Sequence, residues 1–163
     1  MSRMQWSKLK TRVKDRICPE LKGRVDFYLT SYRRAHDDAD TIWVTVDGER
    51  IFEVKYYAYQ KAAAEYYADQ KAEGFFSALP GNAIRGTLSD VEIFSPQDFG
   101  RALRSYLDLS IHDALASTNP LIKAFAIIDR RVGKRTLAKL EIADSEHLLV
   151  KTFYSLASKS HPR

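Results

Sequence analysis

A hairpin in the first third of the chain is the feature that most constrains its fold. Residues 42–46 and 52–56 each carry an apolar side chain at every second position, which is typical of half-buried strands. Asp47-Gly48, a strong signal for a tight turn, lies between them. A third alternating run, residues 25–29, precedes the pair. Because consecutive strands with short connections usually pair, we expect a three-stranded antiparallel meander.

The register of this hairpin depends on how the chain turns at Asp47-Gly48. A strict two-residue turn pairs Val46 with Glu49 and brings acidic residues onto the face of Val44. A three-residue loop with Gly48 in the left-handed bulge position avoids this. We expect the bulged turn, because it keeps the apolar residues of both strands on one face: Ile42, Val44, Phe52 and Val54.

Helical patterns flank the predicted strands. Apolar residues recur every three or four positions from Trp6 to Ile17, which predicts an amphipathic helix. Residues 56–73 are rich in Ala, Gln, Lys and Glu and contain no Gly or Pro, so we expect a helix closed by Gly74. Residues 74–90 have no clear period and indicate a loop, with a short strand possible over 91–94.

The second half carries repeated helix-start signals: Ser95-Pro96-Gln97-Asp98, Ser110 with Asp113, Asn119-Pro120, and Asp144 or Ser145. In the helix that begins at Asn119-Pro120, an apolar stripe runs to Val132, and Gly133 ends or bends it. We therefore predict an α+β fold: an N-terminal helix, a three-stranded antiparallel meander, then a mostly helical C-terminal half packed on the sheet.

Length and composition indicate one domain. The chain has 163 residues, of which 45% are hydrophobic and 29% charged, so residues 1–163 can enclose a single core. Residues 1–55 hold the first helix and the sheet, and residues 56–163 are mainly helical. The residues expected in the core are Trp6, Leu9, Val13, Phe27, Leu29, Ile42, Val44, Phe52, Val54, Phe99, Leu103, Phe125, Ile128, Leu149 and Phe153.

Cysteine use and hydropathy bear on the location of the protein. Cys18 is the one cysteine, so no internal disulfide can form, and a reducing cytoplasm is the expected setting. We interpret Cys18 as a small apolar residue at a helix end and not as a nucleophile. No stretch approaches the roughly 18 apolar residues that a membrane span needs.

Positive charge is concentrated in two places. Residues 1–34 hold ten Lys and Arg against three acids, while the remainder of the chain is slightly acidic. The second place is Asp129–Arg135, where four cations are spaced so that a continuous helix presents them all on one face. Unless acids from Asp108, Asp113, Glu141 or Glu146 offset them, this is a candidate anion site. The candidate binding residues are Arg130, Arg131, Lys134, Arg135, Lys8 and Arg12.

Few other constellations carry chemistry. The chain has no phosphate-binding Gly-rich loop, no zinc motif and no nucleophile elbow, so an enzyme is the less favoured class and no cofactor or metal is expected. His36–Asp40 holds the densest group of metal-ligand types, although a solvated turn explains it better. Tyr59, Ala63 and Tyr66 share one helical face, which we expect to pack its rings on the sheet.

Several blocks resemble a small bacterial protein family of uncharacterised function. They are Gln5–Lys10, Leu21–Val25, Trp43–Gly48, and Asn119–Ile122 leading into Asp129–Arg135. The resemblance leaves out roughly residues 56–94. It implies a bacterial cytoplasmic protein and brings no catalytic residues.

Two classes of function remain open. The leading hypothesis is a non-catalytic binding protein whose partner is another protein, as for an immunity or regulatory partner, because Tyr and Arg are favoured at interface hot spots. The alternative is a nucleic-acid-binding protein that uses the basic N-terminal helix and the Arg130–Arg135 cluster; it requires both segments to share one face. A metal-dependent enzyme at His36–Asp40 is a weaker third possibility.

Overall fold

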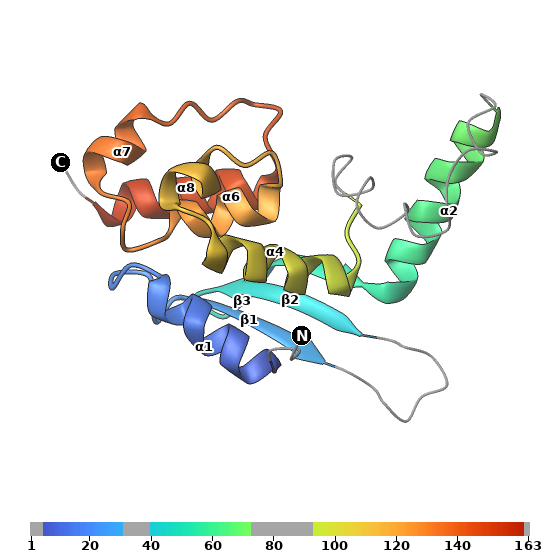
Figure 1. The fold of residues 1–163 in the computed structure, drawn as a ribbon, viewed down its shortest axis with the longest axis horizontal. Coiled ribbons are helices and arrows are strands. Elements are labelled where there is room, and N and C mark those ends of the chain that lie inside the picture. Colours follow the sequence, from blue (N-terminus) through green and yellow to red (C-terminus); the bar gives the residue numbers. More distant parts are fainter. Residues whose placement is uncertain (1–4, 31–39, 73–92, 162–163) are drawn as a thin grey trace.

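The three strands pair in the order in which they occur along the chain. The computed structural model describes residues 5–30, 40–72 and 93–161. In it, β1 (Val25–Thr30), β2 (Thr41–Val46) and β3 (Glu49–Lys55) form one antiparallel sheet in the order β1-β2-β3 (Figure 1). The predicted meander is therefore confirmed.

The hairpin between β2 and β3 corrects the predicted turn. Asp47 and Gly48 have φ angles of 51° and 85°, and they form a two-residue turn that pairs Val46 with Glu49. The register then shifts, so that Phe52 pairs with Val44. The predicted pairing of apolar residues is right, but the three-residue loop is wrong. The extra residue is Ile51, and this bulge inside β3 returns the apolar side chains to the core face.

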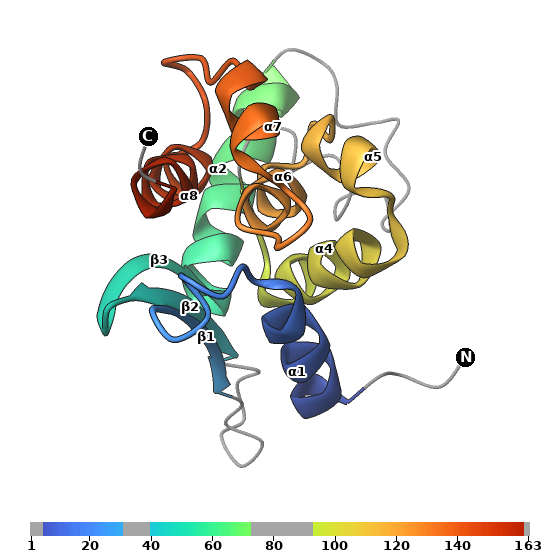
Figure 2. The ribbon, with the colours of Figure 1, turned by 90° about the vertical axis from the view of Figure 1, so that its left-hand side faces the viewer.

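Seven helices are described, one before the sheet and six after it: α1 (Trp6–Arg16), α2 (Tyr56–Ala72), α4 (Pro96–Asp108), α5 (Ile111–Leu115), α6 (Pro120–Ile127), α7 (Lys134–Lys139) and α8 (Leu148–Ser160). With the sheet, they make the predicted α+β fold. In Figure 2 these helices lie beside and above the sheet, on the side of its core face. None of them covers the opposite face of the sheet, which we call the outer face. None is both long and apolar enough to cross a membrane.

The helix starts follow the predicted signals except at the last helix. Ser95 accepts a hydrogen bond from the Asp98 N–H, and the Asp98 carboxylate accepts one from the Ser95 N–H, which completes a capping box at α4. The last helix was expected to begin at Asp144 or Ser145. It begins at Leu148 instead, because His147 Nδ1 accepts the Leu149 N–H. The strand expected over 91–94 is not found at Ile93 and Phe94, and residues 91–92 lie outside the described residues.

Aromatic rings form the centre of the core. Phe125 contacts the rings of Phe27, Phe99, Tyr106 and Phe153, at centroid distances of 5.4 to 6.4 Å. The ring contacts join β1, α4, α6 and α8. Of the predicted core residues, Trp6, Leu29 and Phe52 are partly buried against the core and the others are buried in it.

Helix α2 projects away from the main body (Figure 1). Its Ala63 and Tyr67 are buried, and Tyr59 and Tyr66 pack around them together with Ile93. This cluster is separate from the main core. Of the tyrosines expected to pack on the sheet, Tyr59 lines a hollow beside Phe52 and Val54 of β3, and Tyr66 packs in the cluster of α2.

Candidate functional site

The basic segment Asp129–Arg135 is not one continuous helix. Helix α6 ends at Ile127 and α7 begins at Lys134, so the expectation of four cations on one helical face is wrong. The chain leaves the helix because it pairs with the end of α1. The Cys18 N–H donates to the Ile128 carbonyl at 2.8 Å, and Ile17 and Asp129 form an antiparallel bridge.

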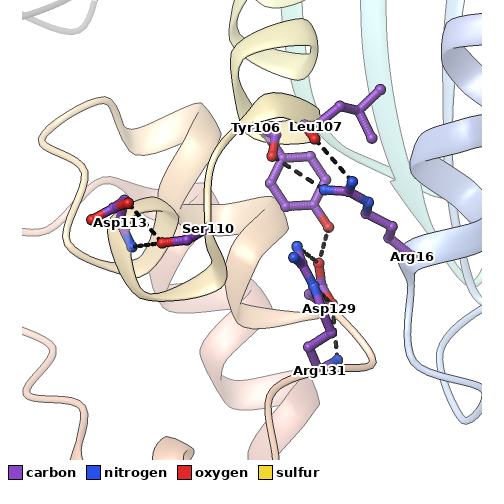
Figure 3. A network of polar contacts seen from close by, with 7 residues as sticks. All are labelled: Arg16, Tyr106, Leu107, Ser110, Asp113, Asp129 and Arg131. Carbon is purple, nitrogen blue, oxygen red and sulfur yellow. Dashed lines mark hydrogen bonds and ion pairs between the residues drawn. The ribbon is translucent and has the colours of Figure 1, made fainter.

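Asp129 is the centre of a buried polar network (Figure 3). None of its side chain is exposed. Its carboxylate accepts hydrogen bonds from Nε and Nη2 of Arg131 at 2.9 and 2.7 Å, and from the Tyr106 hydroxyl at 2.5 Å. Burial raises the pKa of Asp129, but the hydrogen bonds from Arg131 and Tyr106 outweigh it, so the pKa lies below the ordinary value. Asp129 is therefore an ionised partner for Arg131.

The acids proposed to offset the cluster from other helices do not reach it. Asp113 bonds to Ser110, and Glu146 pairs with Lys123 at 2.7 Å. Among the described residues, no ion pair joins Asp108 or Glu141 to Arg130, Arg131 or Arg135. Arg131 is thus neutralised by its own neighbour, whereas Arg130 and Arg135 have no carboxylate partner in the described part of the chain.

Arg16 fastens the end of α1 to the end of α4. Its Nη2 donates to the Leu107 carbonyl at 2.9 Å and its Nη1 to the Tyr106 carbonyl at 3.4 Å. These are terminal carbonyls of α4, where a cation also interacts favourably with the helix dipole. The Arg16 carbonyl in turn accepts the Arg130 N–H at 2.7 Å. This last hydrogen bond joins the two basic segments of the sequence.

Helix α1 presents cations on two opposite flanks. Leu9 and Val13 are buried, and at 3.6 residues per turn Lys8, Arg12 and Arg16 lie on one flank of that buried stripe. These three residues span about 12 Å along the helix, and the last is next to Arg130. We call Lys8, Arg12, Arg16 and Arg130 the α1 strip. It brings together three of the residues that the sequence analysis singled out, namely Lys8, Arg12 and Arg130.

Arg135 lies on a different part of the surface. With His112 and Lys139 it borders a hollow between α5 and α7, which we call the α5–α7 hollow. Leu115 and Leu140 supply apolar surface to it. The predicted single cluster is therefore divided: Arg130 joins the α1 strip, Arg131 pairs inward with Asp129, and Arg135 faces this hollow.

Sequence reasoning missed a second basic surface on the outer face of the sheet. Here Tyr28 and Trp43 occupy paired positions on β1 and β2, and their rings stack with centroids 5.3 Å apart. Lys10 Nζ lies 4.2 Å from the Tyr28 ring centroid, and the Arg50 guanidinium lies 4.3 Å from that of Trp43. We call these four residues the outer stack. The available signal was their position: Tyr28 and Trp43 alternate with the core residues of their strands.

Carboxylates hold the cations of this face in place. Asp26 pairs with Lys10 at 2.8 Å and with Lys14 at 3.3 Å. Burial alone would raise the pKa of Asp26. The hydrogen bonds from Lys10, the Phe27 N–H and the Tyr28 hydroxyl outweigh burial, so the pKa lies below the ordinary value. Glu53 pairs with Arg50 at 3.1 Å and with Lys55 at 3.5 Å. Among the described residues, these ion pairs join four cations of the face to two carboxylates.

Two other candidates from the sequence lie apart from these surfaces or outside the described residues. Cys18 is 4% exposed, and burial raises the pKa of its thiol, which is the opposite of nucleophile activation. Of the metal candidate His36–Asp40, residues 36–39 lie outside the described residues.

Comparison with known proteins identifies a family and no activity. A family model described as the SF0329 protein family matches residues 5–157. No curated protein matches the chain, and no solved structure matches it either.

Proposed function

The chain belongs to the SF0329 protein family, and we propose that it is a non-catalytic protein that binds nucleic acid along the α1 strip. The observation that carries the proposal is the hydrogen bond from the Arg130 N–H to the Arg16 carbonyl. It supports the condition that the two basic segments share one surface. The bacterial cytoplasmic setting implied by the sequence stays a prediction.

Uncompensated charge supports a polyanionic ligand. Lys8 and Arg130 have no carboxylate partner among the described residues, while Asp129 is fully engaged by Arg131 and Tyr106. Cations close together on a surface repel one another, and an external anion relieves that repulsion. A nucleic-acid backbone supplies a row of phosphates, and the counterions released on binding add to the affinity.

The test measures how salt affects binding. The protein is titrated with a mixed-sequence DNA and RNA pool between about 50 and 200 mM salt. A contact with Z phosphates gives a slope of roughly −0.9Z in log K against log salt on duplex DNA. The double variant Lys8→Glu/Arg130→Glu should weaken binding and flatten the slope. The matched control is Lys61→Glu/Lys151→Glu, the same charge change on α2 and α8, and it should alter binding less. A wild-type protein that does not bind at low salt contradicts the proposal.

The α5–α7 hollow favours a second candidate function, the binding of a partner protein. Apolar surface at Leu115 and Leu140 lines the same hollow as the cations Arg135 and Lys139, and this suits an acidic partner that also offers an apolar side chain. We propose that the protein acts in this way as an immunity or regulatory partner of another protein. In pull-downs from a host lysate, Arg135→Glu/Leu140→Asp should lose a stoichiometric protein that Lys8→Glu/Arg130→Glu retains. Recovery of the same proteins by both variants counts against this candidate.

A further inference from the structure

The two ends of the outer stack are held very differently. At one end, Lys10 has 24% of its side chain exposed and is bonded to Asp26. Asp26 is fixed in turn by the Phe27 N–H at 2.8 Å and the Tyr28 hydroxyl at 3.0 Å. At the other end, Arg50 has 57% of its side chain exposed, and it contacts the Trp43 ring and Glu53. The stack is therefore closed at Lys10 and loosely covered at Arg50.

Relative energies favour exchange of Arg50 for a nucleic-acid base. An exposed cation over an aromatic ring and an exposed ion pair, such as that of Arg50 with Glu53, are both weak interactions. A base stacked on an aromatic side chain is as strong as the two together or stronger. A base that takes the place of Arg50 on Trp43 therefore roughly offsets or exceeds what is lost, and the released guanidinium can bind the adjacent phosphate.

We propose that the outer face binds single-stranded nucleic acid by stacking one base on Trp43 in place of Arg50. The inference rests on the proposed function for the class of polymer but uses a different surface, since Lys10 and Lys14 lie on the flank of α1 opposite Lys8 and Arg12. Among the described residues of this face, cations outnumber carboxylates in the ion pairs, which suits a phosphate backbone. The bases of a duplex are stacked inside it, so a duplex cannot make this contact.

Tryptophan fluorescence tests the contact directly. The chain has two tryptophans, and Trp6 packs against Phe27 and Phe99 in the core. Single-stranded oligothymidylate and oligoadenylate of twelve nucleotides should quench the tryptophan emission of the wild-type protein, while a duplex of the same length should quench it much less. Trp43→Phe keeps a stacking ring but removes the reporter, so it should bind with similar affinity and show little quenching.

Affinity measurements separate this inference from the proposed function. Trp43→Leu should weaken oligothymidylate binding roughly 5- to 150-fold, the equivalent of one lost stack. Arg50→Ala should keep or increase the quenching at saturation, because the ring is already uncovered. Circular dichroism confirms that each variant is folded.

Each outcome decides one of the two statements. Single strands that bind without quenching, or equally well to Trp43→Leu, overturn the stacking inference and leave the α1 strip in place. Equal quenching of wild type and Trp43→Phe also overturns it, because the signal then comes from Trp6. If the wild-type protein binds neither single strands nor duplex, both proposals fail.

Discussion

The Tyr106 hydroxyl donates a hydrogen bond to Oδ2 of Asp129, a carboxylate with no exposed surface. Tyr106 is on α4 and Asp129 is on the turn between α6 and α7, so the contact joins two parts of the helical half (Figure 3). Burial, and then the hydrogen bond to Asp129, raise the pKa of Tyr106, so the phenol remains a donor at all ordinary pH values.

Removing that hydroxyl should destabilise the fold. Tyr106→Phe leaves the ring in place but deprives the Asp129 carboxylate of one donor. A hydrogen bond to a charged group contributes about 1.5–3 kcal/mol, and we expect a loss of that order in the free energy of unfolding. Urea denaturation measures it. The matched control is Tyr154→Phe, which loses only a 3.4 Å bond to the Leu137 carbonyl and should cost under about 1 kcal/mol. Equal losses in both variants would contradict this account.

Asp129 should also make stability depend on pH in the acid range. Its folded-state pKa is lowered, so the unfolded chain takes up the proton first as the pH falls. The stability that it contributes is complete above about pH 5 and is lost as the pH falls through the unfolded and then the folded pKa. Asp129→Asn should lower stability at neutral pH and flatten the profile between about pH 5 and 2. The pKa of Asp26 is also lowered, so its own contribution to the dependence of stability on pH remains in the variant. Unfolding curves at several pH values check this, and an unchanged slope would refute it.

The centre of the core gives the largest expected effect. Phe125 is 1% exposed and has four aromatic neighbours. Phe125→Ala should lower the free energy of unfolding by about 3–5 kcal/mol, from lost burial and the cavity that remains. Thermal and urea denaturation measure the change. A loss below about 1 kcal/mol is incompatible with the packing described.

The β2–β3 turn allows a test of backbone strain alone. At Gly48 φ is +85°, and an added Cβ would meet no atom within 4 Å. Gly48→Ala should therefore cost about 1–2 kcal/mol through its left-handed backbone and not through a clash. Gly23 also has open space around it but no left-handed φ, so Gly23→Ala should be neutral or stabilising. Denaturation midpoints compare the two, and equal effects would exclude backbone strain as the cause.

Local patterns predicted most elements of this fold. Alternation predicted the strands, and the capping signals at Ser95, Ser110 and Asn119 marked three helix starts correctly. The bulge was predicted in the turn but lies at Ile51 in β3. The alternation of apolar residues requires one extra residue in the hairpin but does not indicate its position. The start at Leu148 was missed because a histidine, which is not a preferred N-cap residue, accepts the Leu149 N–H.

The candidate site was predictable in its residues more than in its arrangement. The charges of Arg130, Arg131 and Arg135 were visible, but their directions depend on where α6 ends. That end is set by pairing with Ile17 and Cys18, which are far away in sequence. The outer stack was missed for a similar reason, because Tyr28, Trp43 and Arg50 meet only once three strands are in register.

The joint between the ends of α1 and α4 also bears on how the chain folds. Arg16 and Leu107 are 91 positions apart, so their contact closes a very long loop of chain. The entropy cost of closing a loop rises with its length, and nothing local compensates it at this point. The hairpin of β2 and β3 and the capped α4 can form early, whereas this joint must wait until the sheet and the helical half have met. Substitutions at Arg16 should therefore speed unfolding more than they slow folding.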